Sequence, residues 1–449
     1  MTRPLPFLLL ALSLLALACK LFASATPAPL PTRTAILPTT QPPPPVTLPS
    51  TEFLTPQPTA QTSPQATTNP LGEREVCPGQ GQALALLVEP SLSAAIRPGL
   101  EGFEADLCGE GYHVFENDLP FAGPPDLRGY LIDLYARTGG SLTGVYLIGN
   151  QPHAYQWVTA VSTNPSFPST SEEVISLQYY ADLDGIFETS PGYASPNGRP
   201  FSFDVHRDQV DWEIWVSVLP TYGDPGKTSE ALLRYFAKNH TYRAGGYDVP
   251  RGFLEVSEHF NAATPEQHNT LMNGLISGDY AWTPLSNSPE AHIYFESPTQ
   301  GLTVDQGYAL LSGAGADLAV LDAHGFWGAS GRLDIPWVES HPLRTVFLWS
   351  NGCAVGDLDQ PLTFLSTALY APQSLALVAK GTTNNSGGMG TNAEGFFGHN
   401  VASTLASGGT FGEAILRHVN TPLIYPWSDS REFHYATVVI LGDPTLRRR

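Results

Sequence analysis

Short, continuous apolar runs alternate with helical segments along most of the chain, and this alternation restricts the fold more than any other feature. The first three runs are ALALLVE, YHVFEN and GVYLIGN, and the two segments between them carry apolar residues at helical spacing. Runs that are apolar throughout are typical of parallel strands covered on both faces. The order strand, helix, strand, helix, strand therefore predicts an α/β fold with a mostly parallel sheet.

The alternation resumes towards the end of the chain. DLAVLDAHG, RTVFLWSNGC, SLALVAKGTT and YATVVILGDP are further apolar runs, with helical segments before the first and before the last of them. A chain of 449 residues is long enough for two compact units. We predict two α/β subdomains with mostly parallel sheets, residues 77–260 and residues 261–449.

Residues 1–19 are predicted to be an export signal and not part of the fold. Arg3 precedes the apolar run Phe7–Ala18, which is too short to span a bilayer, and Cys19 follows it. This pattern resembles a bacterial lipoprotein signal, in which the cysteine is lipidated; an ordinary secretion signal and an uncleaved anchor are the alternatives. We expect an exported protein, either a lipoprotein facing the cell surface or periplasm, or a secreted one.

Residues 20–76 are predicted to form a disordered stalk. Between Phe22 and Gly72 the only charged residues are Arg33 and Glu52, and the segment is rich in Pro, Thr, Ala, Ser and Gln. Such a composition cannot bury enough apolar surface to fold, and prolines favour an extended chain. The segment would hold the folded part away from a membrane.

Three cysteines follow the predicted signal: Cys77, Cys108 and Cys353. An oxidising exterior permits disulfides. Cys77 and Cys108 could pair and join the start of the folded region to the end of its first helix. Cys353 would then be the odd thiol, and an odd thiol in an exported protein needs an explanation.

Two apolar runs end in a reactive side chain beside a glycine. His324 precedes Gly325, and Cys353 follows Gly352. If the two strands are adjacent and parallel, both side chains emerge at one edge of the sheet, where ligands bind. An imidazole raises the thiolate fraction of a nearby thiol and can then protonate a leaving amine. The N–H groups of Gly325 and Cys353 are candidates for an oxyanion hole. A buried inert cysteine and a structural histidine are the alternative interpretation.

These motifs resemble those of the caspase-like cysteine peptidases, in which a His-Gly strand end precedes a Cys strand end. The closer resemblance is to gingipain-type peptidases: GVYLIGNQPHAYQW, YYADLDG, EIWVSVLP, a helix containing KNHTYR and the terminal LGDPTLR occur in that family's order, from Ala83 to Arg447. The resemblance implies a caspase-like three-layer αβα sandwich with its chemistry in the second subdomain. It also implies peptide-bond hydrolysis with Cys353 as nucleophile and His324 as general acid and base.

The chain departs from that family directly after the His-Gly pair. Phe326 and Trp327 stand where small polar residues are common in the family. Two aromatic side chains at this position could narrow the cleft or only pack against it.

Several acidic residues are candidates for supporting roles. Asp322 lies two residues before His324 on the same face of the expected strand, so it could orient the imidazole, or it could be an edge carboxylate in water. Asp208 and Asp211 lie near the place where gingipain-like enzymes carry a carboxylate for a basic substrate side chain. A preference for arginine or lysine is therefore a hypothesis.

A second acidic group surrounds a glycine in DLDGIFE, where the acids are Asp182, Asp184 and Glu188. The spacing is somewhat like that of a calcium-binding loop, although shorter. A solvated acidic turn is the alternative. We predict that no cofactor is required and that a structural calcium ion could bind here.

Charge and missing motifs exclude other classes of function. The net charge is −20, and the only basic run is Arg447–Arg449, so we predict no nucleic-acid partner. The sequence has no H-E-x-x-H, Cys-x-x-Cys, G-x-S-x-G or P-loop motif, which argues against zinc hydrolases and the other classes these motifs define. The expected partners are protein or peptide substrates, with a membrane contacted only through a lipid anchor.

Three functions are compatible with these sequence features. The first is an extracytoplasmic cysteine endopeptidase with a Cys-His dyad and a backbone oxyanion hole. The second is a sortase-like transpeptidase on the same scaffold, in which an amine captures the acyl-enzyme. The third is a non-catalytic surface binding module, which would need neither His324 nor Cys353.

Overall fold

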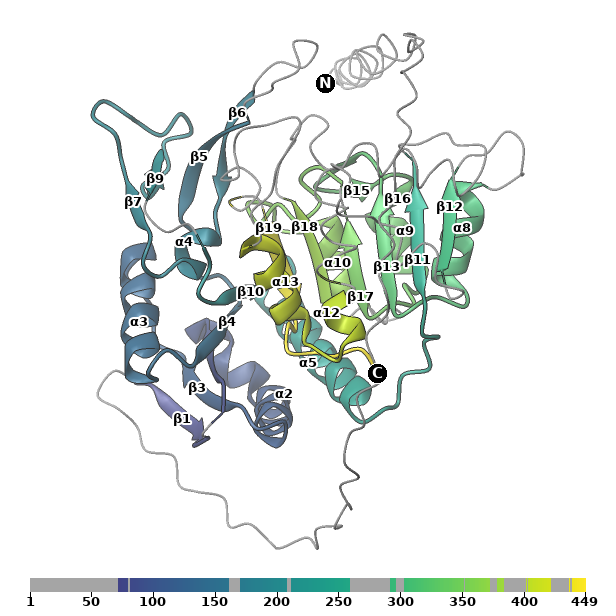
Figure 1. Cartoon of the computed structure of the whole chain (residues 1–449), viewed down its shortest axis with the longest axis horizontal. Coiled ribbons are helices and arrows are strands. Elements are labelled where there is room, and N and C mark those ends of the chain that lie inside the picture. The colour runs from purple at the N-terminus through teal and green to yellow at the C-terminus, as the bar shows by residue number, and fades with distance from the viewer. Residues whose placement is uncertain are drawn as a thin grey trace, which may run out of the picture. The chain divides into compact units, whose positions relative to one another are not determined.

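One long sheet runs through the described part of the chain in a computed structural model of the protein (Figure 1). The structure describes residues 72–79, 81–160, 170–207, 211–258, 291–295, 303–350, 352–371, 378–382, 401, 403–420, 436 and 438–449. They all belong to one unit, Ser63–Arg449. The predicted signal and most of the predicted stalk lie outside the described residues.

Eleven strands of the described residues form this sheet. In spatial order they are β1 (Arg74–Cys77), β3 (His113–Asn117), β2 (Ala83–Val88), β4 (Leu142–Ile148), β10 (Trp215–Leu219), β19 (Val438–Gly442), β18 (Val378–Thr382), β17 (Phe347–Ser350), β13 (Leu318–Asp322), β11 (Phe253–Ser257) and β12 (Ala291–Phe295).

Most strand pairs in this sheet are parallel. β3, β2, β4 and β10 pair in parallel, and so do β18, β17, β13, β11 and β12. β1 is antiparallel to β3, and β19 is antiparallel to β18. β10 meets β19 at one register position, Val218 opposite Leu441. The predicted α/β class with mostly parallel strands is confirmed.

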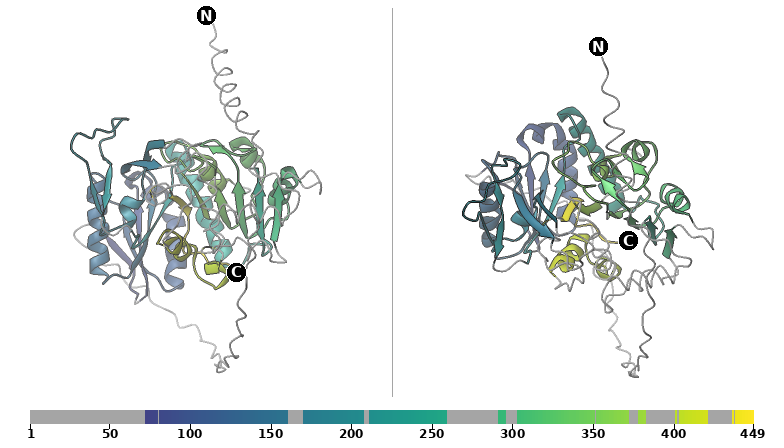
Figure 2. Two further views of the ribbon diagram at one scale, coloured as in Figure 1. Left: turned by 45° about the horizontal axis from the view of Figure 1, so that its top comes forward. Right: turned by 90° about the horizontal axis from the view of Figure 1, so that it is seen from above.

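Most strands of the main sheet are apolar along their length because helices cover the sheet. Every residue of β2, β10, β11, β17 and β19 is buried. The covering helices are α2 (Pro90–Gly109), α3 (Pro124–Arg137), α4 (Gln178–Ala181), α5 (Pro225–Arg243), α8 (Val304–Ser312), α9 (Ile335–Ser340), α10 (Phe364–Tyr370), α12 (Ser403–Ala406) and α13 (Phe411–Asn420). In the right-hand view of Figure 2, α2 and α5 lie on one side of the sheet and the yellow α13 lies on the other.

Helix α2 continues through Pro98. Proline has no N–H and therefore leaves one intrahelical hydrogen bond unmade. The helix is nevertheless held by its buried face, since α2 packs along α5 and the rings of Phe103 and Phe236 stack with centroids 5.3 Å apart. Tertiary packing here outweighs the local cost of proline.

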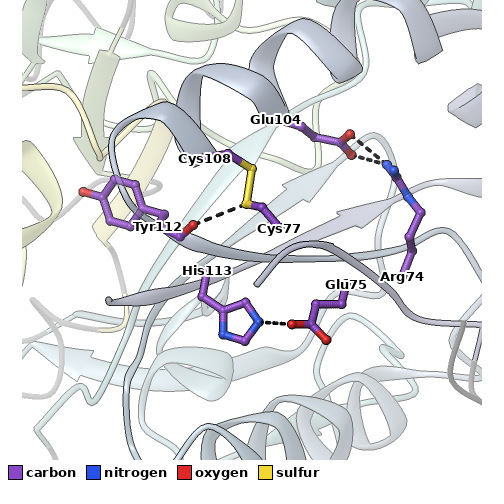
Figure 3. The surroundings of a disulfide bond; sticks show 7 residues. All are labelled: Arg74, Glu75, Cys77, Glu104, Cys108, Tyr112 and His113. Carbon is purple, nitrogen blue, oxygen red and sulfur yellow. Dashed lines mark hydrogen bonds and ion pairs between the residues drawn. A yellow bond between two sulfur atoms is a disulfide. The ribbon is translucent and has the colours of Figure 1, made fainter. Parts of the chain in front are cut away.

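The first described strand, β1, begins at Arg74, close to the predicted end of the stalk at residue 76, which stays a prediction. Arg74 donates hydrogen bonds to Glu104 at 2.6 Å and to Glu116 at 2.7 Å. The Cys77–Cys108 disulfide joins the end of β1 to the last turn of α2 (Figure 3). The sequence of β1 lacks the apolar run by which the other strands were predicted. Ion pairs and a disulfide hold this strand instead.

The sheet does not break at the predicted subdomain boundary. β11 ends before residue 260, yet it lies between β13 and β12 and so groups with the later strands. The division into 77–260 and 261–449 stays a prediction. Among the described residues, no helix combines the length and the apolar character that crossing a bilayer requires.

Three small sheets accompany the eleven-stranded sheet in the described residues. β5 (Tyr155–Ala160) pairs with β6 (Thr170–Ile175) and β8 (Ser202–Phe203), and β7 (Ile186–Glu188) pairs with β9 (Val205–Arg207). After β13, three two-residue strands form a third small sheet: β14 (Gly325–Phe326), β15 (Ala329–Ser330) and β16 (Leu333–Asp334). None of these small sheets was predicted from the sequence.

Candidate active site

The two candidate catalytic residues follow neighbouring parallel strands. β13 and β17 pair in register from Leu318 with Phe347 to Leu321 with Ser350. His324 follows the end of β13, and Cys353 follows the end of β17. Because parallel neighbours end at the same edge, the backbone carries both residues to one edge of the sheet.

The backbones beside these two residues touch. A Cβ atom added to Gly325 would lie 2.7 Å from the Cα atom of Gly352, and one added to Gly352 would lie 3.2 Å from the Cα atom of Gly325. Real side chains do not fit at such distances, so only glycine lets the segments after His324 and before Cys353 meet. The strand-end glycines in the sequence therefore have a structural reason.

A short hairpin fixes the position of His324. β14 and β15 pair antiparallel, and the N–H of Gly331 donates to the carbonyl of His324 at 2.6 Å. At the base of the hairpin, the buried hydroxyls of Ser330 and Ser350 are 3.0 Å apart and hydrogen-bonded. Since Ser350 ends β17, this bond connects the His324 hairpin to the segment that carries Cys353.

The hairpin pattern also orients one candidate oxyanion donor. In an antiparallel ladder, hydrogen-bonded and non-hydrogen-bonded residue pairs alternate. The hydrogen bond from Gly331 to His324 marks these two residues as a hydrogen-bonded pair. The next pair along the ladder, Gly325 with Ser330, is therefore a non-hydrogen-bonded one. The N–H of Gly325 therefore points away from β15, as an oxyanion donor requires.

The backbone after Cys353 is strained. Ala354 has φ = 54°, the one positive value of a non-glycine residue among those the structure describes. A left-handed conformation costs an L-residue about 1–2 kcal/mol, and such strain is concentrated at functional sites. The turn is held in place because the N–H of Leu365 donates to the carbonyl of Val355 at 3.1 Å, at the start of α10.

Cys353 is partly exposed and is not in a disulfide, and His324 is exposed. A reagent in solution can therefore reach this edge. The pairing of Cys77 with Cys108, which the sequence left open, makes Cys353 the thiol outside the disulfide among the described cysteines.

Comparisons with known proteins bear on the fold. No protein-family model matches the chain, and no curated protein sequence matches it. The structure is similar to the crystal structure of the Arg-specific cysteine proteinase gingipain R, with a TM-score of 0.54 and 14% identity, over 82% of this chain and 78% of that chain. The chain shares the fold of gingipain R.

Two further solved structures are matched weakly. One is the Saccharomyces cerevisiae separase–securin complex, with a TM-score of 0.30 and 11% identity over 51% of this chain and 15% of that chain. The other is a C2-type ketoreductase from a modular polyketide synthase, with a TM-score of 0.15 and 13% identity over 67% and 77%. Neither score supports an inference.

Of the three acids predicted to support catalysis, the structure describes Asp211 in full and Asp322 in its backbone. The backbone of Asp322 ends β13 opposite Ser257, but its side chain lies outside the described part of the structure, as does all of Asp208. Asp211 precedes β10 and is exposed. The loop after Cys353 instead meets the other end of β10, where Thr221 and Gln360 line one depression. The structure therefore does not bring Asp211 to that depression.

The acidic group near DLDGIFE differs from the predicted set. Carboxylate oxygens of Asp182, Asp184 and Glu213 lie within 4.8 Å of one another. Glu188 is not in the group, because it lies on β7 and accepts a hydrogen bond from Arg207 at 2.8 Å. Glu213 replaces it, from a position remote in sequence, and burial raises the pKa of the Glu213 carboxyl to about 7, with Asp184 and Asp182 adding to the rise.

The ligand types in this group fit a hard cation, since carboxylate oxygens are what calcium binds. The backbone carbonyls of the loop are engaged elsewhere: Arg128 donates to the carbonyls of Asp182 at 2.9 Å, Leu183 at 3.1 Å and Gly185 at 2.8 Å. A bound cation would therefore rely on the three carboxylates and on water.

A clamp that the sequence did not reveal holds the loop after Cys353. Asp359 accepts hydrogen bonds from the hydroxyl of Tyr155 at 2.8 Å and from Arg199 at 2.9 Å. The guanidinium of Arg199 also lies over the Tyr155 ring, 4.6 Å from its centroid. The small sheet of β5 and β8 is in this way fastened to the loop that carries Cys353.

Proposed function

We propose that this protein is a cysteine endopeptidase that hydrolyses peptide bonds with Cys353 as nucleophile and His324 as general acid and base. The observation that carries the proposal is the contact between Gly325 and Gly352 at the ends of the adjacent parallel strands β13 and β17. A binding module would have no use for a thiol and an imidazole brought to one edge in this way. The shared fold of gingipain R supports the proposal.

In the first step, the sulfur of Cys353 attacks the carbonyl carbon of the peptide bond. The thiol proton passes to the imidazole of His324, so the thiolate is the attacking species. The negative charge that develops on the carbonyl oxygen is stabilised by the N–H groups of Gly325 and Cys353. Glycine at 325 lets the segments that carry His324 and Cys353 approach each other closely.

In the second step, the imidazolium of His324 gives its proton to the leaving nitrogen. The C–N bond breaks, the amine product departs, and the acyl group stays on Cys353 as a thioester. Water then attacks the thioester while His324 accepts a proton from it, and the carboxylic acid product and free thiol are released.

Further residues have supporting roles in the proposed enzyme. Asp322 is the proposed orienting acid for His324, and helices on both faces of the sheet would make a three-layer caspase-like sandwich. Asp182, Asp184 and Glu213 would hold a structural calcium ion, with no cofactor needed for the reaction. Export, with lipidation at Cys19 as the membrane contact, is supported by the Cys77–Cys108 disulfide, because disulfides persist in oxidising compartments.

Cleavage of denatured casein by the wild-type chain and by Cys353→Ala and His324→Ala tests the proposal. We expect each substitution to lower the rate by at least about 10⁴-fold, because nucleophile and base act as a unit. Casein cleavage by Cys353→Ala near the wild-type rate would refute the proposal.

The mass of the products with and without an added amine distinguishes hydrolysis from amine capture. We expect free carboxylic acid products in both cases. Amide products that form only with the amine would instead identify a transpeptidase.

A further inference from the structure

Large apolar side chains are exposed at few positions in the described part of the chain. They are Leu119, Ile132, Phe201, Phe326 and Trp327. Phe326 is 54% exposed and Trp327 is 45% exposed. Leaving a large apolar side chain in water forgoes the favourable free energy of burying it. These two are adjacent to each other and follow the His324–Gly325 pair directly, so their exposure points to a ligand at this edge.

The aromatic pair is held in a fixed arrangement. The rings of Phe326 and Trp327 meet edge to face with centroids 5.7 Å apart. A Cβ atom on Gly328 would lie 2.9 Å from the Phe326 ring, so the ring lies across the hairpin turn. The carbonyl of Trp327 accepts a hydrogen bond from the N–H of Phe364 at 2.7 Å, which fastens the turn to α10. A preorganised surface binds with a smaller entropic cost.

The strand geometry places the pair relative to the imidazole. Residues two apart in an extended chain point to the same face and are separated by about 7 Å. Phe326 is two residues beyond His324 and leads into the turn at Trp327. Gly325, between His324 and Phe326, is the residue whose backbone meets Gly352, next to Cys353. The aromatic pair therefore lies beside His324 at the edge of the sheet that also carries Cys353.

The proposed chemistry then decides which part of a substrate the pair meets. His324 must face the leaving nitrogen to protonate it, and that nitrogen belongs to the residue after the cleaved bond. A group about 7 Å from the imidazole on the same extended segment is within reach of the first or second residue on this leaving side. The two rings present apolar surface and no formal charge, so they suit a large aliphatic or aromatic side chain.

We propose that Phe326 and Trp327 form an apolar subsite for the first or second residue after the cleaved bond. The inference rests on the proposed peptidase function and adds a preference to it.

The test uses cleavage sites first mapped in casein with the wild-type chain. Quenched peptides are then built that share the residues before the mapped bond and carry Phe, Leu, Gly or Asp in the first two positions after it. The double variant Phe326→Ala/Trp327→Ala is compared with Phe201→Ala, an exposed aromatic residue before β8. A methyl ester of the same acyl part serves as a substrate with no residue on the leaving side.

We expect the double variant to lose at least about tenfold in kcat/KM on the Phe and Leu peptides and less than about twofold on the Gly peptide and the ester. Phe201→Ala should cleave all substrates as the wild type does. An unchanged preference for Phe over Gly in the double variant overturns the inference, even while ester hydrolysis supports the peptidase function. Absence of ester and casein hydrolysis in the wild type would overturn both proposals.

Discussion

Two groups of polar side chains follow strand ends in this protein, and they are built in opposite ways. Asp443, directly after β19, is fully buried and accepts hydrogen bonds from Tyr146 at 2.5 Å, Asn239 at 2.7 Å and Arg243. His324 and Cys353, after β13 and β17, are exposed and partly exposed. The first group is sealed and has hydrogen bonds on both carboxylate oxygens, whereas the second stays open to solvent.

We therefore expect the buried Asp443 group to stabilise the fold and the exposed edge with His324 and Cys353 to carry the reaction. Burial alone would raise the pKa of Asp443, but the charge of Arg243 and the hydrogen bonds of Thr445, Tyr146 and Asn239 lower it, so the carboxylate is charged inside the protein. Removing one member leaves the others buried without a partner, which is costly. At the open edge, water can replace a lost partner, so a substitution there should affect the reaction and leave the fold intact.

The largest expected effect on stability comes from the sealed group. Asp443→Ala should lower the free energy of unfolding by about 3–5 kcal/mol, because it removes the buried one of the two counter-charges of Arg243 and leaves Tyr146 and Asn239 without their acceptor. Denaturant unfolding measures this. As a control, Asp305→Ala removes an exposed partner of Arg332 and should cost less than about 1 kcal/mol. Equal losses in the free energy of unfolding for the two substitutions would contradict the claim that the buried Asp443 group stabilises the fold more than an exposed ion pair does.

The disulfide should have the next largest effect. Cys77→Ala/Cys108→Ala opens a loop with a sequence separation of 31 residues and should cost about 2–4 kcal/mol. Thermal unfolding of the double variant, compared with that of the wild-type chain, checks this. Casein cleavage should be unchanged well below the unfolding temperature, because six strands of the sheet separate β1 from β17. A loss of activity in folded protein would show that β1 and the open edge are coupled.

Ala354 should show a smaller effect at the open edge. Ala354→Gly removes the penalty of a left-handed conformation and should raise the free energy of unfolding by about 1 kcal/mol. The same change loosens the turn that carries Cys353, so kcat should fall. Ala406→Gly in the short helix α12 is the control and should destabilise the protein. A destabilised Ala354→Gly protein would contradict the strained turn.

The smallest expected effect concerns Glu213, which is only half-buried and therefore screened by water. Its carboxyl has a pKa raised to about 7 in the folded protein, so its contribution favours folding below its ordinary value and is lost as pH rises through about 7. Tm measured without calcium should fall across this range more in the wild type than in Glu213→Gln. Added calcium should reduce the fall in the wild type. If Tm fell by the same amount across this pH range in the wild type and in Glu213→Gln, a role for Glu213 would be contradicted.

The apolar strands were the predictable part of the fold. β2, β4, β13, β17 and β19 lie within apolar runs, and sequence alone predicted each of these strands, although the predicted runs extend up to about three residues past the observed ends. The strands of the small sheets escaped prediction because β14, β15 and β16 are two residues long and have no measurable periodicity. β1 escaped because charged side chains and a disulfide hold it.

The site was predictable in outline only. Parallel strands end together, so the sequence could indicate that His324 and Cys353 share an edge. The bond between Ser330 and Ser350 and the approach of Glu213 to Asp182 arise from contacts between distant segments, and no local pattern signals them. The left-handed conformation of Ala354 is imposed by its surroundings, because alanine itself does not favour it.

The central claim is that the imidazole of His324 acts on the sulfur of Cys353. The most direct test is the rate at which iodoacetamide alkylates Cys353 at about pH 6.5, near the ordinary pKa of an imidazole, followed by peptide mapping, in the wild type and in His324→Ala. An imidazole beside the sulfur raises the reactive thiolate fraction, so we predict a wild-type rate at least about tenfold higher. Equal rates in the two proteins would contradict the claim.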